Sequence, residues 1–378
     1  MSYIVIIAAV ISFAVTAVSG RFLIPFLKKL KYGQTILEIG PNWHKSKEGT
    51  PTMGGLMFIL GITVASVVGF VLMLIFDKGY KTENVRFVAG IIMALGFAAL
   101  GFVDDYVKVV KKRNLGLTAS QKMVGQIAIA IMYLLIVFFG GDSNTTIWFP
   151  FISYVDFGFL YYPIAVFIIV GFVNAVNLTD GIDGLASSVT FVASLGFMTV
   201  TALLRAYSMD VIAAALAGGC LGFLIYNFHP AKVFMGDTGS MFLGGLVVAL
   251  AFGIHQPLLL IFFGIIYLIE AGSVMLQVTY FKLTHGKRIF KMSPIHHHFE
   301  MCGWNEEKIV FTFSAVTLVF SVIAVLSVVN LVNYGRVQLG TFQKKREKKP
   351  RQDRSDLSAS CACHPHNRTY NAFLCKLC

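Results

Sequence analysis

Four polar residues recur at every third position between two apolar runs of the chain, 158–173 and 185–204. They are Asn174, Asn177, Asp180 and Asp183. On a helix, this spacing would place them on one slowly drifting face. Carboxylates at the end of a membrane-spanning segment need a cation, a basic partner or a polar substrate to offset their desolvation. The pattern therefore indicates a cation or substrate site, with a capped helix end carrying two exposed acids as the alternative.

A second pair of acids, Asp104 and Asp105, ends another apolar run and precedes a basic cluster. Adjacent carboxylates repel each other, so such a pair favours a divalent metal ion, a protonated member or a lysine partner. The lysines that follow are Lys108, Lys111, Lys112 and Lys122. Acids beside basic residues suit a metal-bound phosphate. The same lysines would also serve as plain anchors at the membrane surface.

Asp237 stands where a further apolar run begins, within the sequence FMGDTGS at residues 234–240. Gly236 and Gly239 flank it and would let the backbone approach a ligand closely. The N-terminus of a helix can host a phosphate, and a carboxylate there can hold Mg²⁺ to it. The alternative is that Asp237 or Ser240 only caps the helix.

Three successive histidines, His296, His297 and His298, lie in a polar segment at 292–300. Consecutive side chains cannot all point one way on a helix or a strand, so a metal site made of this triplet alone is sterically poor. One or two imidazoles that bind a phosphate or orient a substrate fit the pattern better. A solvated loop is the alternative.

Two further features are less specific. Residues 45–55 contain Lys47, Thr52 and a Gly-Gly pair, which suit anion binding but are also ordinary turn chemistry. Glu270 lies deep inside an apolar run, and we interpret it as a structural partner within the helix bundle. The sequence contains neither a Walker motif nor a Rossmann fingerprint, so nothing suggests work driven by ATP or NAD.

Membrane-spanning helices must position these residues. Hydrophobic residues make up 56% of the 378 residues and only 13% are charged, whereas about a quarter of a soluble domain is charged. The apolar runs are continuous over lengths that cross a bilayer, which predicts an all-α polytopic membrane protein and makes strands unlikely. We expect about ten spans, near 3–26, 53–76, 86–103, 123–140, 158–176, 185–204, 211–227, 239–254, 257–280 and 309–334.

Ten spans divide the loops into two sets by parity. The set that contains the candidate site residues holds sixteen lysines and arginines, and the opposite set holds four, when the C-terminal tail and Arg21 are left out. The positive-inside rule then places the site in the cytoplasm and both chain ends outside. Ten of the 31 basic residues follow position 335, so the net charge of +12 does not imply nucleic-acid binding.

Residues 336–378 differ from the rest of the chain. A basic run at 344–354 lies on the side predicted to be outer, and Cys361, Cys363, His364 and His366 have a spacing that zinc ligands also show. The tail lacks the apolar periodicity of a core, so we interpret it as a disordered or non-native extension. We therefore expect a membrane domain at 1–335 and a separate tail at 336–378.

The acids, lysines, histidines and glycines gathered at one membrane face favour a reaction class. They suit a Mg²⁺-dependent phosphoryl or phosphosugar transfer between a nucleotide substrate and a phosphate-bearing lipid. The rival of another class is a transporter of a polyprenyl or anionic solute. A transporter would place its polar groups near the bilayer midplane on broken helices, whereas the predicted spans contain few charged side chains.

Five stretches carry a resemblance to a known family: GTPTMGG at 49–55, VDDY at 103–106, NAVNLTDGIDG at 174–184, FMGDTGS at 234–240 and PIHHHFE at 294–300. The chain resembles the polyprenyl-phosphate N-acetylhexosamine-1-phosphate transferase superfamily over about residues 1–335. Within it, the chain is most similar to the phospho-N-acetylmuramoyl-pentapeptide-transferase family of peptidoglycan synthesis. The sister branch that uses UDP-GlcNAc is the alternative.

The resemblance implies an activity and a location. UDP-MurNAc-pentapeptide would donate phospho-MurNAc-pentapeptide to undecaprenyl phosphate, giving lipid I and UMP, with Mg²⁺ as cofactor. The enzyme would be a multi-pass protein of the bacterial inner membrane, with its active site facing the cytoplasm, and could form a homodimer.

The resemblance also implies roles for individual residues. The catalytic group would be Asp104 as the base, its neighbour Asp105, Asp237 and His297. The metal would be bound chiefly by Asp237, near Asn177 and Asp180. The substrate-binding group would comprise Lys47, Thr52, Lys108, Lys112, Lys122, Asn174, Asn177, Asp180, Asp183, Phe234, Gly236, His296 and His298, with Phe234 against the uracil ring.

Overall fold

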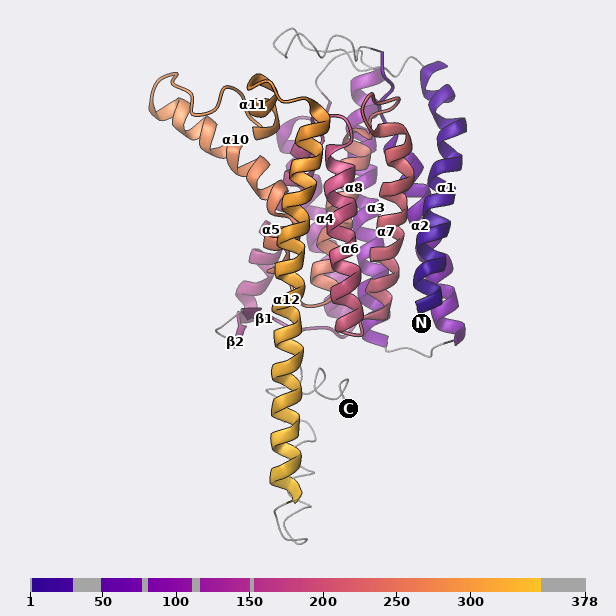
Figure 1. Cartoon of the computed structure of the whole chain (residues 1–378), viewed down its shortest axis with the longest axis vertical. Helices are drawn as coiled ribbons and strands as arrows, with labels where there is room; N and C mark the ends of the chain where they lie inside the picture. Colours follow the sequence, from indigo (N-terminus) through magenta and orange to yellow (C-terminus); the bar gives the residue numbers. More distant parts are fainter. Residues whose placement is uncertain (1, 30–48, 77–80, 111–115, 150–152, 348–378) are drawn as a thin grey trace.

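The computed structural model describes residues 2–29, 49–76, 81–110, 116–149 and 153–347. It is a bundle of long helices, which confirms the predicted all-α polytopic fold (Figure 1). Within these residues, nine helices are long and apolar enough to cross a membrane. They are α1 (Ser2–Lys29), α2 (Gly55–Phe76), α3 (Lys81–Val110), α4 (Ala119–Phe139), α5 (Tyr161–Thr179), α6 (Leu185–Leu203), α7 (Tyr207–Asn227), α8 (Gly236–Gly253) and α12 (Glu306–Glu347).

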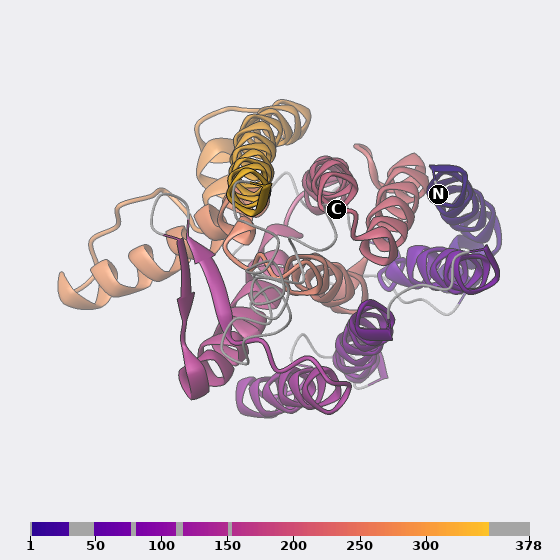
Figure 2. The same ribbon diagram turned by 90° about the horizontal axis from the view of Figure 1, so that it is seen from below.

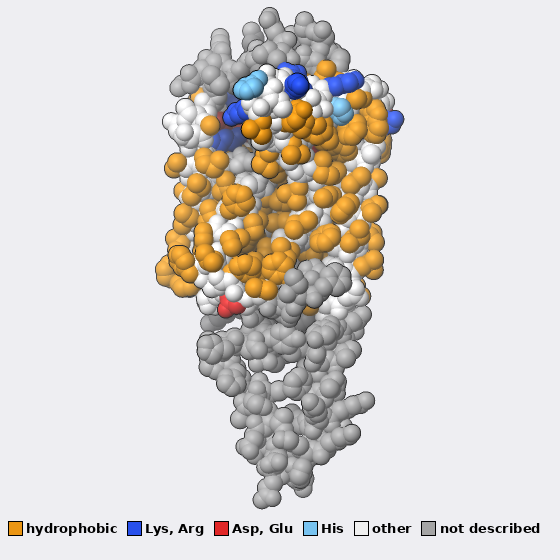
Figure 3. Space-filling view, turned by 90° about the vertical axis from the view of Figure 1, so that its left-hand side faces the viewer, with side chains coloured by type: hydrophobic (Ala, Val, Ile, Leu, Met, Phe, Trp, Pro, Cys, Tyr) orange, Lys and Arg blue, Asp and Glu red, His pale blue; other side chains and the backbone are white. Residues whose placement is uncertain are grey.

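Helices α7 and α8 form the centre of the bundle. Most of each spanning segment is buried inside the protein, 83% for α7 and 89% for α8, whereas the outer helices expose large apolar side chains. Helix α8 packs on α3 and α5, and α7 packs on α1, α2 and α6. The exposed apolar side chains form a continuous belt around the face drawn in Figure 3, which is the surface that lipid would cover.

The ninth expected span, 257–280, takes a different form. It consists of a short helix α9 (Leu259–Phe263) and a separate helix α10 (Ile265–Leu283), and α10 is not among the nine candidate spans. The helix breaks at Gly264, where the ring of Phe172 occupies the space that a side chain would need. Helix α10 then leans away from the bundle (Figures 1 and 2).

The connection between α4 and α5 contains two short strands that the apolar runs do not predict. Strands β1 (Thr146–Phe149) and β2 (Ser153–Asp156) form an antiparallel hairpin in the connection between α4 and α5, with Thr146 opposite Asp156. A short 3₁₀ helix, η2 (Gly158–Leu160), follows. The strand residues include the β-branched and aromatic types that favour a pleated surface. The hairpin lies at the end of the bundle, outside the belt of spanning helices (Figure 1).

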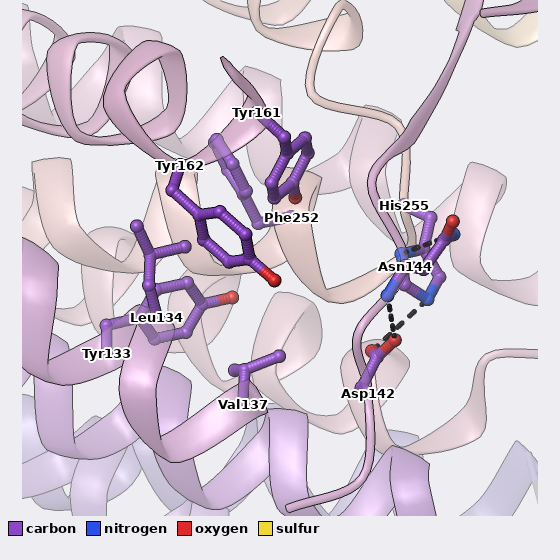
Figure 4. A pocket seen from close by; sticks show the side chains of 9 residues that line it. All are labelled: Tyr133, Leu134, Val137, Asp142, Asn144, Tyr161, Tyr162, Phe252 and His255. Atoms are coloured by element: carbon purple, nitrogen blue, oxygen red, sulfur yellow. Dashed lines mark hydrogen bonds and ion pairs between the residues drawn. The ribbon is translucent and has the colours of Figure 1, made fainter. Parts of the chain in front are cut away.

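A small polar pocket lies beside this hairpin connection. Asp142 holds Arg86 through a 2.7 Å contact with its Nε, and lies 3.3 Å from Nε2 of His255. Arg86 also donates to the carbonyl oxygen of Gly253 at the end of α8. Figure 4 shows the pocket lined by Tyr133, Leu134, Val137, Asp142, Asn144, Tyr161, Tyr162, Phe252 and His255. This network ties the α4–α5 connection to α3 and α8.

The opposite end of the bundle collects the segments that carry the candidate site. The end of α3, the α5–α6 turn, the α7–α8 connection and helix α11 (Ile295–Met301) all lie there (Figure 1). Lysine and arginine side chains cluster at the same end above the apolar belt (Figure 3). The histidine segment, for which a solvated loop was the alternative, is partly helical, because α11 contains all three histidines.

Candidate active site

Three carboxylates from two helices meet at this end. Asp104 and Asp105 lie near the end of α3, and Asp237 lies in the first turn of α8. Each offers an oxygen atom, and these atoms lie within 4.8 Å of one another. Gly101 makes the close approach possible, because a side chain there would overlap the backbone of Asp237.

Two lysines neutralise part of this charge. The Nζ atom of Lys108 lies 2.6 Å from Asp104 and 2.8 Å from Asp237, and it lies 3.8 Å from Asp105. Lys122, from α4, reaches the same oxygen of Asp237 at 3.1 Å. Three carboxylates against two ammonium groups leave a negative charge in excess, so the cluster can accept a further cation.

Asp105 is bound tightly to the start of α8. Its carboxylate accepts hydrogen bonds from the backbone N–H of Asp237 at 3.2 Å and of Thr238 at 2.9 Å. It also accepts the Thr238 hydroxyl at 2.7 Å. These groups are the first N–H donors of the helix, which lack partners inside it. The geometry thus gives Asp105 the task of fixing α8, and with it Asp237, against α3.

Asp104 is held differently from its neighbour. Its Oδ1 atom accepts the backbone N–H of Leu117 at 2.8 Å, and its Oδ2 atom contacts Lys108. The carboxylate is almost fully buried, although the lysine that contacts it is about one-third exposed. A group in this position faces the cluster rather than the helix start. Asp104 is therefore held by Lys108 and by the backbone at Leu117, whereas Asp105 is held by the start of α8.

The polar residues of α5 divide between two tasks. Asn177 donates its side-chain N–H groups to Asp237 Oδ1 at 2.8 Å and to Ser240 at 2.7 Å, so it belongs to the cluster. Asn174 lies one turn deeper and exchanges two hydrogen bonds with Gln126 of α4, at 2.7 and 3.1 Å. Its amide is occupied by this contact between helices, so the structure gives it no open polar group for a substrate.

Asp180 stands just beyond the end of α5, between two groups of acids. Burial, together with the negative charges of Asp237, Asp105 and Asp183, raises the pKa of Asp180 to about 8. A carboxyl group in this position releases its proton readily only when a cation approaches. The electrostatic coupling shows that Asp180 lies within the field of the three-carboxylate cluster.

Asp183 belongs to a second group. Its Oδ2 atom lies 3.0 Å from Nδ1 of His229 and accepts the backbone N–H of Ala231 at 2.9 Å. Its own backbone N–H donates to Glu306 at the start of α12. Asp183, His229 and Glu306 satisfy the distances of a metal site, but the oxygens that face one another already accept these hydrogen bonds. We interpret this group as the tie that holds the α5–α6 turn to α12.

The three histidines have three different partners, as their consecutive positions predict. His296 Nδ1 lies 3.0 Å from Glu270 of α10, and His297 Nδ1 lies 2.6 Å from Glu300. His298 accepts the backbone N–H of Lys291. His296 is completely buried, whereas His297 keeps a small exposed surface.

The glycine-rich segment before α2 lines the start of α8. The backbone of Phe234 donates to Pro51 at 2.9 Å and accepts from Gly54 at 2.8 Å. Thr52 lies beside Gly236, whose φ of 70° is accessible to glycine without strain. Phe234 is half-buried and lies three residues before Asp237 in the chain. Lys47 and Lys112, two of the expected substrate-binding residues, lie outside the described residues.

The donor set fits a hard divalent cation. Carboxylate oxygens are the ligands that Mg²⁺ prefers, and here they converge with an excess of negative charge. The Asn177 amide donates to Asp237 of this cluster, and the Asp180 carboxyl group interacts with it electrostatically. The position of the Lys108 ammonium, in contact with all three acids, marks where positive charge is stabilised.

Several residues of the site were not identified from the sequence. Gln126, Thr238, His229, Glu300 and Glu306 each hold one of the expected residues in place. Only Glu300 and Thr238 lie inside recognised motifs, so only these two could have been found from the sequence. Gln126 and Glu306 lie on α4 and α12, and His229 lies in the α7–α8 connection, so only packing brings these three to the site.

Two sequence-family patterns match the chain. Glycosyl transferase family 4 matches residues 87–255, and signature 1 of phospho-N-acetylmuramoyl-pentapeptide-transferase matches residues 47–59. With nine candidate spans among the described residues and an acidic cluster at one end of the bundle, these matches define the class of the protein. It is a multi-pass membrane phosphoglycosyl transferase.

Relatives named phospho-N-acetylmuramoyl-pentapeptide-transferase are similar over most of the chain. The one from Heliobacterium modesticaldum is 47% identical over 320 residues, 84% of this chain and 96% of the relative. Those from Listeria welshimeri and Halalkalibacterium halodurans are 45% and 44% identical, over 86% and 85% of this chain and 99% and 97% of the relatives. The chain belongs to the phospho-N-acetylmuramoyl-pentapeptide-transferase family.

Proposed function

We propose that the protein transfers phospho-MurNAc-pentapeptide from UDP-MurNAc-pentapeptide to undecaprenyl phosphate, giving lipid I and UMP. This reaction is the first membrane step of peptidoglycan synthesis. The names of the relatives support the donor sugar. The observation that carries the proposal is the cluster itself, in which Asp104 and Asp237 from two spanning helices converge on Lys108 at the basic end of the bundle.

The donor is a pyrophosphate, and its negative charge must be offset before an anionic acceptor can approach. Asp237, with Asn177 and Asp180 beside it, would hold Mg²⁺ at the cluster. Bound there, Mg²⁺ supplies charge screening of the pyrophosphate and stabilises the UMP leaving group. Lys122, which already contacts Asp237, is placed to contact a phosphate oxygen. The half-buried Phe234, three residues before Asp237, would offer the aromatic surface on which uracil packs.

The acceptor is a lipid phosphate that reaches the cluster from the surrounding membrane. Asp104 accepts its remaining proton, and Lys108 holds the phosphate in line with the donor. An oxygen of the acceptor phosphate attacks the phosphorus that carries the sugar, and the bond from that phosphorus to the UMP oxygen breaks. We favour this direct attack over a covalent aspartyl intermediate, since an anionic acceptor needs little further activation.

The basic end of the bundle faces the cytoplasm in this proposal. Lysines and arginines gather there above the apolar belt (Figure 3), as the positive-inside rule requires of cytoplasmic loops. The nucleotide donor is made in the cytoplasm, so this orientation gives it direct access to the cluster. The membrane is the inner membrane of a bacterium, since peptidoglycan precursors are assembled there.

A comparison of donors tests the proposed function. Purified protein is supplied with undecaprenyl phosphate, Mg²⁺ and either UDP-MurNAc-pentapeptide or UDP-GlcNAc, and UMP and the lipid product are measured. Release of UMP with the first donor alone, together with a lipid of the mass of lipid I, is the expected result. Turnover of UDP-GlcNAc would assign the chain to the sister reaction. Solute flux through reconstituted vesicles without UMP release would favour a transporter.

A further inference from the structure

Glu270 lies in the middle of α10 and is completely buried. A carboxyl group removed from water is costly unless it has a partner. The partner is His296 of α11, whose Nδ1 atom lies 3.0 Å from Oε2 of Glu270 and whose ring is also completely buried. The two side chains therefore form a closed pair between α10 and the histidine segment.

The far edge of the His296 ring reaches the acidic turn between α5 and α6. Its Nε2 and Cε1 atoms lie against the backbone of Gly181, in the space that any side chain at 181 would need. Gly181 directly follows Asp180, the residue that caps the C-terminal end of α5. Glu270, His296 and Gly181 thus form a continuous line of contact from α10 to the turn that carries Asp180.

The burial of His296 decides how it can act. A ring without exposed surface does not touch a large donor in this conformation, although its neighbours in the triplet are partly exposed. His297 packs on it, with ring centroids 4.1 Å apart. His296 can therefore influence the reaction only through what it supports, namely the turn at Gly181 and the ring of His297.

The pair is poorly explained as a source of stability. Oε1 of Glu270 and Nε2 of His296 have no hydrogen-bond partner within the described part of the chain, and both atoms are buried. Each such group is costly, because it loses its hydrogen bonds to water without gaining a partner. Replacing a buried polar pair by apolar side chains of similar volume is often neutral or stabilising. The contact between Glu270 and His296 is therefore better explained by its effect on the orientation of the His296 ring than by a gain in stability.

We propose that Glu270 is a positioning residue for donor binding, because it orients His296, which in turn supports the turn that presents Asp180 to the nucleotide donor. This inference rests on the proposed function, since the donor is needed to measure it. Helix α10 leaves the bundle at an angle (Figures 1 and 2), so the pair is also the buried contact that fixes this helix to α11.

Steady-state kinetics of three variants test the proposal. Glu270→Leu removes the acceptor for His296, and Glu270→Gln keeps a side-chain oxygen that can accept from Nδ1–H. Ser273→Ala is the matched control, since Ser273 is buried one turn further along α10 and its hydroxyl bonds only to the carbonyl oxygen of Glu270. The apparent KM for each substrate, kcat and the thermal midpoint are measured in detergent.

Glu270→Leu is expected to raise the KM for the donor about tenfold or more, with the KM for the lipid acceptor within about twofold of the parent. Glu270→Gln restores most of the donor affinity, and Ser273→Ala matches the parent. A lowered thermal midpoint with an unchanged donor KM in Glu270→Leu would show that the pair is only structural. An equal rise of both KM values would also overturn the proposal.

His296→Asn supplies an independent arm. Asparagine places an amide where Nδ1 was and keeps the contact with Glu270, but it is too short to reach Gly181. The donor KM is expected to rise in this variant. Adding Glu270→Leu should raise it no further, since both changes interrupt the same series of contacts from Glu270 through His296 to Gly181. If the two substitutions instead raised the donor KM by independent factors that multiply in the double variant, the proposal would be contradicted.

A spectroscopic measurement separates this inference from the proposed function. In ¹⁵N-histidine-labelled protein, the Nδ1 proton of His296 should give a downfield signal, assigned by its loss in His296→Asn. The signal should persist in Glu270→Gln and Ser273→Ala and vanish in Glu270→Leu, and its persistence in Glu270→Leu would refute the orienting contact. Absence of UMP release by the parent protein would instead reject the proposed function.

Discussion

The ammonium group of Lys108 joins two helices of the bundle, because its Nζ atom lies 2.6 Å from Asp104 on α3 and 2.8 Å from Asp237 on α8. The two acids come from parts of the chain that are far apart in sequence, and each contributes one oxygen to the same cation. The contact shows that the end of α3 and the start of α8 form one electrostatic unit. Predictions about this unit can be tested residue by residue.

Replacing Asp237 removes the acid that contacts both lysines and Asn177. We expect Asp237→Ala to lower the exchange of radiolabelled UMP into the UDP-sugar by at least about a hundredfold, because the main oxygen ligand of the cation is lost. The control is Asp210→Asn, a change at a buried acid in the first turn of α7. Full exchange activity in Asp237→Ala would remove this residue from its role.

Asp104→Asn tests the proposed base. The amide keeps the acceptor for the backbone N–H of Leu117, so the local structure should persist, but it cannot take up a proton. UMP exchange is expected to be abolished, with a thermal midpoint close to that of the parent. Wild-type exchange in a well-folded Asp104→Asn protein would mean that the acceptor needs no base at this position.

Asp105 should matter for stability as well as for activity. Asp105→Ala leaves the first N–H groups of α8 and the Thr238 hydroxyl without their acceptor. The expected cost is about 1–3 kcal/mol of unfolding free energy, measured by denaturant unfolding in detergent. Asp105→Asn, which keeps an acceptor oxygen, should lose less. Equal stability of the alanine variant and the parent would show that Asp105 does not anchor α8.

The burial of His255, at the other end of the bundle, predicts that the stability of the folded protein depends on pH. Burial, assisted by the charge of Arg86, lowers the pKa of His255 to about 4 from its ordinary value of 6.5. The folded state therefore favours the neutral ring, and its contribution is present above pH 6.5 and lost as pH falls toward 4. The loss at pH 5 is on the order of 2 kcal/mol.

Thermal unfolding at pH 7 and pH 5 checks this dependence. The unfolding midpoint of the parent should be lower at pH 5 than at pH 7. This decrease should be smaller in His255→Gln, which has no titrating ring. Acidic groups elsewhere titrate in both proteins, so only the difference between the two decreases is informative. An identical decrease in both would mean that His255 titrates normally.

The C-terminal tail is expected to be dispensable. Residues after about 336 lie beyond the spanning part of α12, which ends at Val332. A protein that ends at residue 336 should retain the UMP release rate of the full chain, because every described contact of the acidic cluster involves residues before it. A truncated protein that folds but is inactive would assign the tail a role in the reaction.

The sequence was sufficient for most of the fold, because apolar runs of bilayer length leave few alternatives. It was not sufficient for α10. Glu270 and Gln277 interrupt the run, and the helix breaks at Gly264, where the ring of Phe172 from a distant helix packs against the backbone. The hairpin β1–β2 was missed because its two strands are four residues each and lie in a connection rather than in a span.

The site was predicted in composition but not in detail. Spacing alone places Asn174 and Asn177 on one face, yet the first pairs with Gln126 and only the second reaches Asp237. Adjacent acids such as Asp104 and Asp105 are equivalent in sequence, and the start of α8 distinguishes them. Such differences arise from contacts between helices, and the spacing of residues in the sequence does not indicate these contacts.

The central claim is that the acidic cluster uses a divalent cation to transfer a phosphosugar to a lipid phosphate. The most direct test is UMP release by the purified protein with UDP-MurNAc-pentapeptide and undecaprenyl phosphate, with Mg²⁺ or with EDTA. The account predicts release that requires the donor, the lipid and Mg²⁺ together. Release that continues at the same rate in EDTA, or without the lipid, would contradict it.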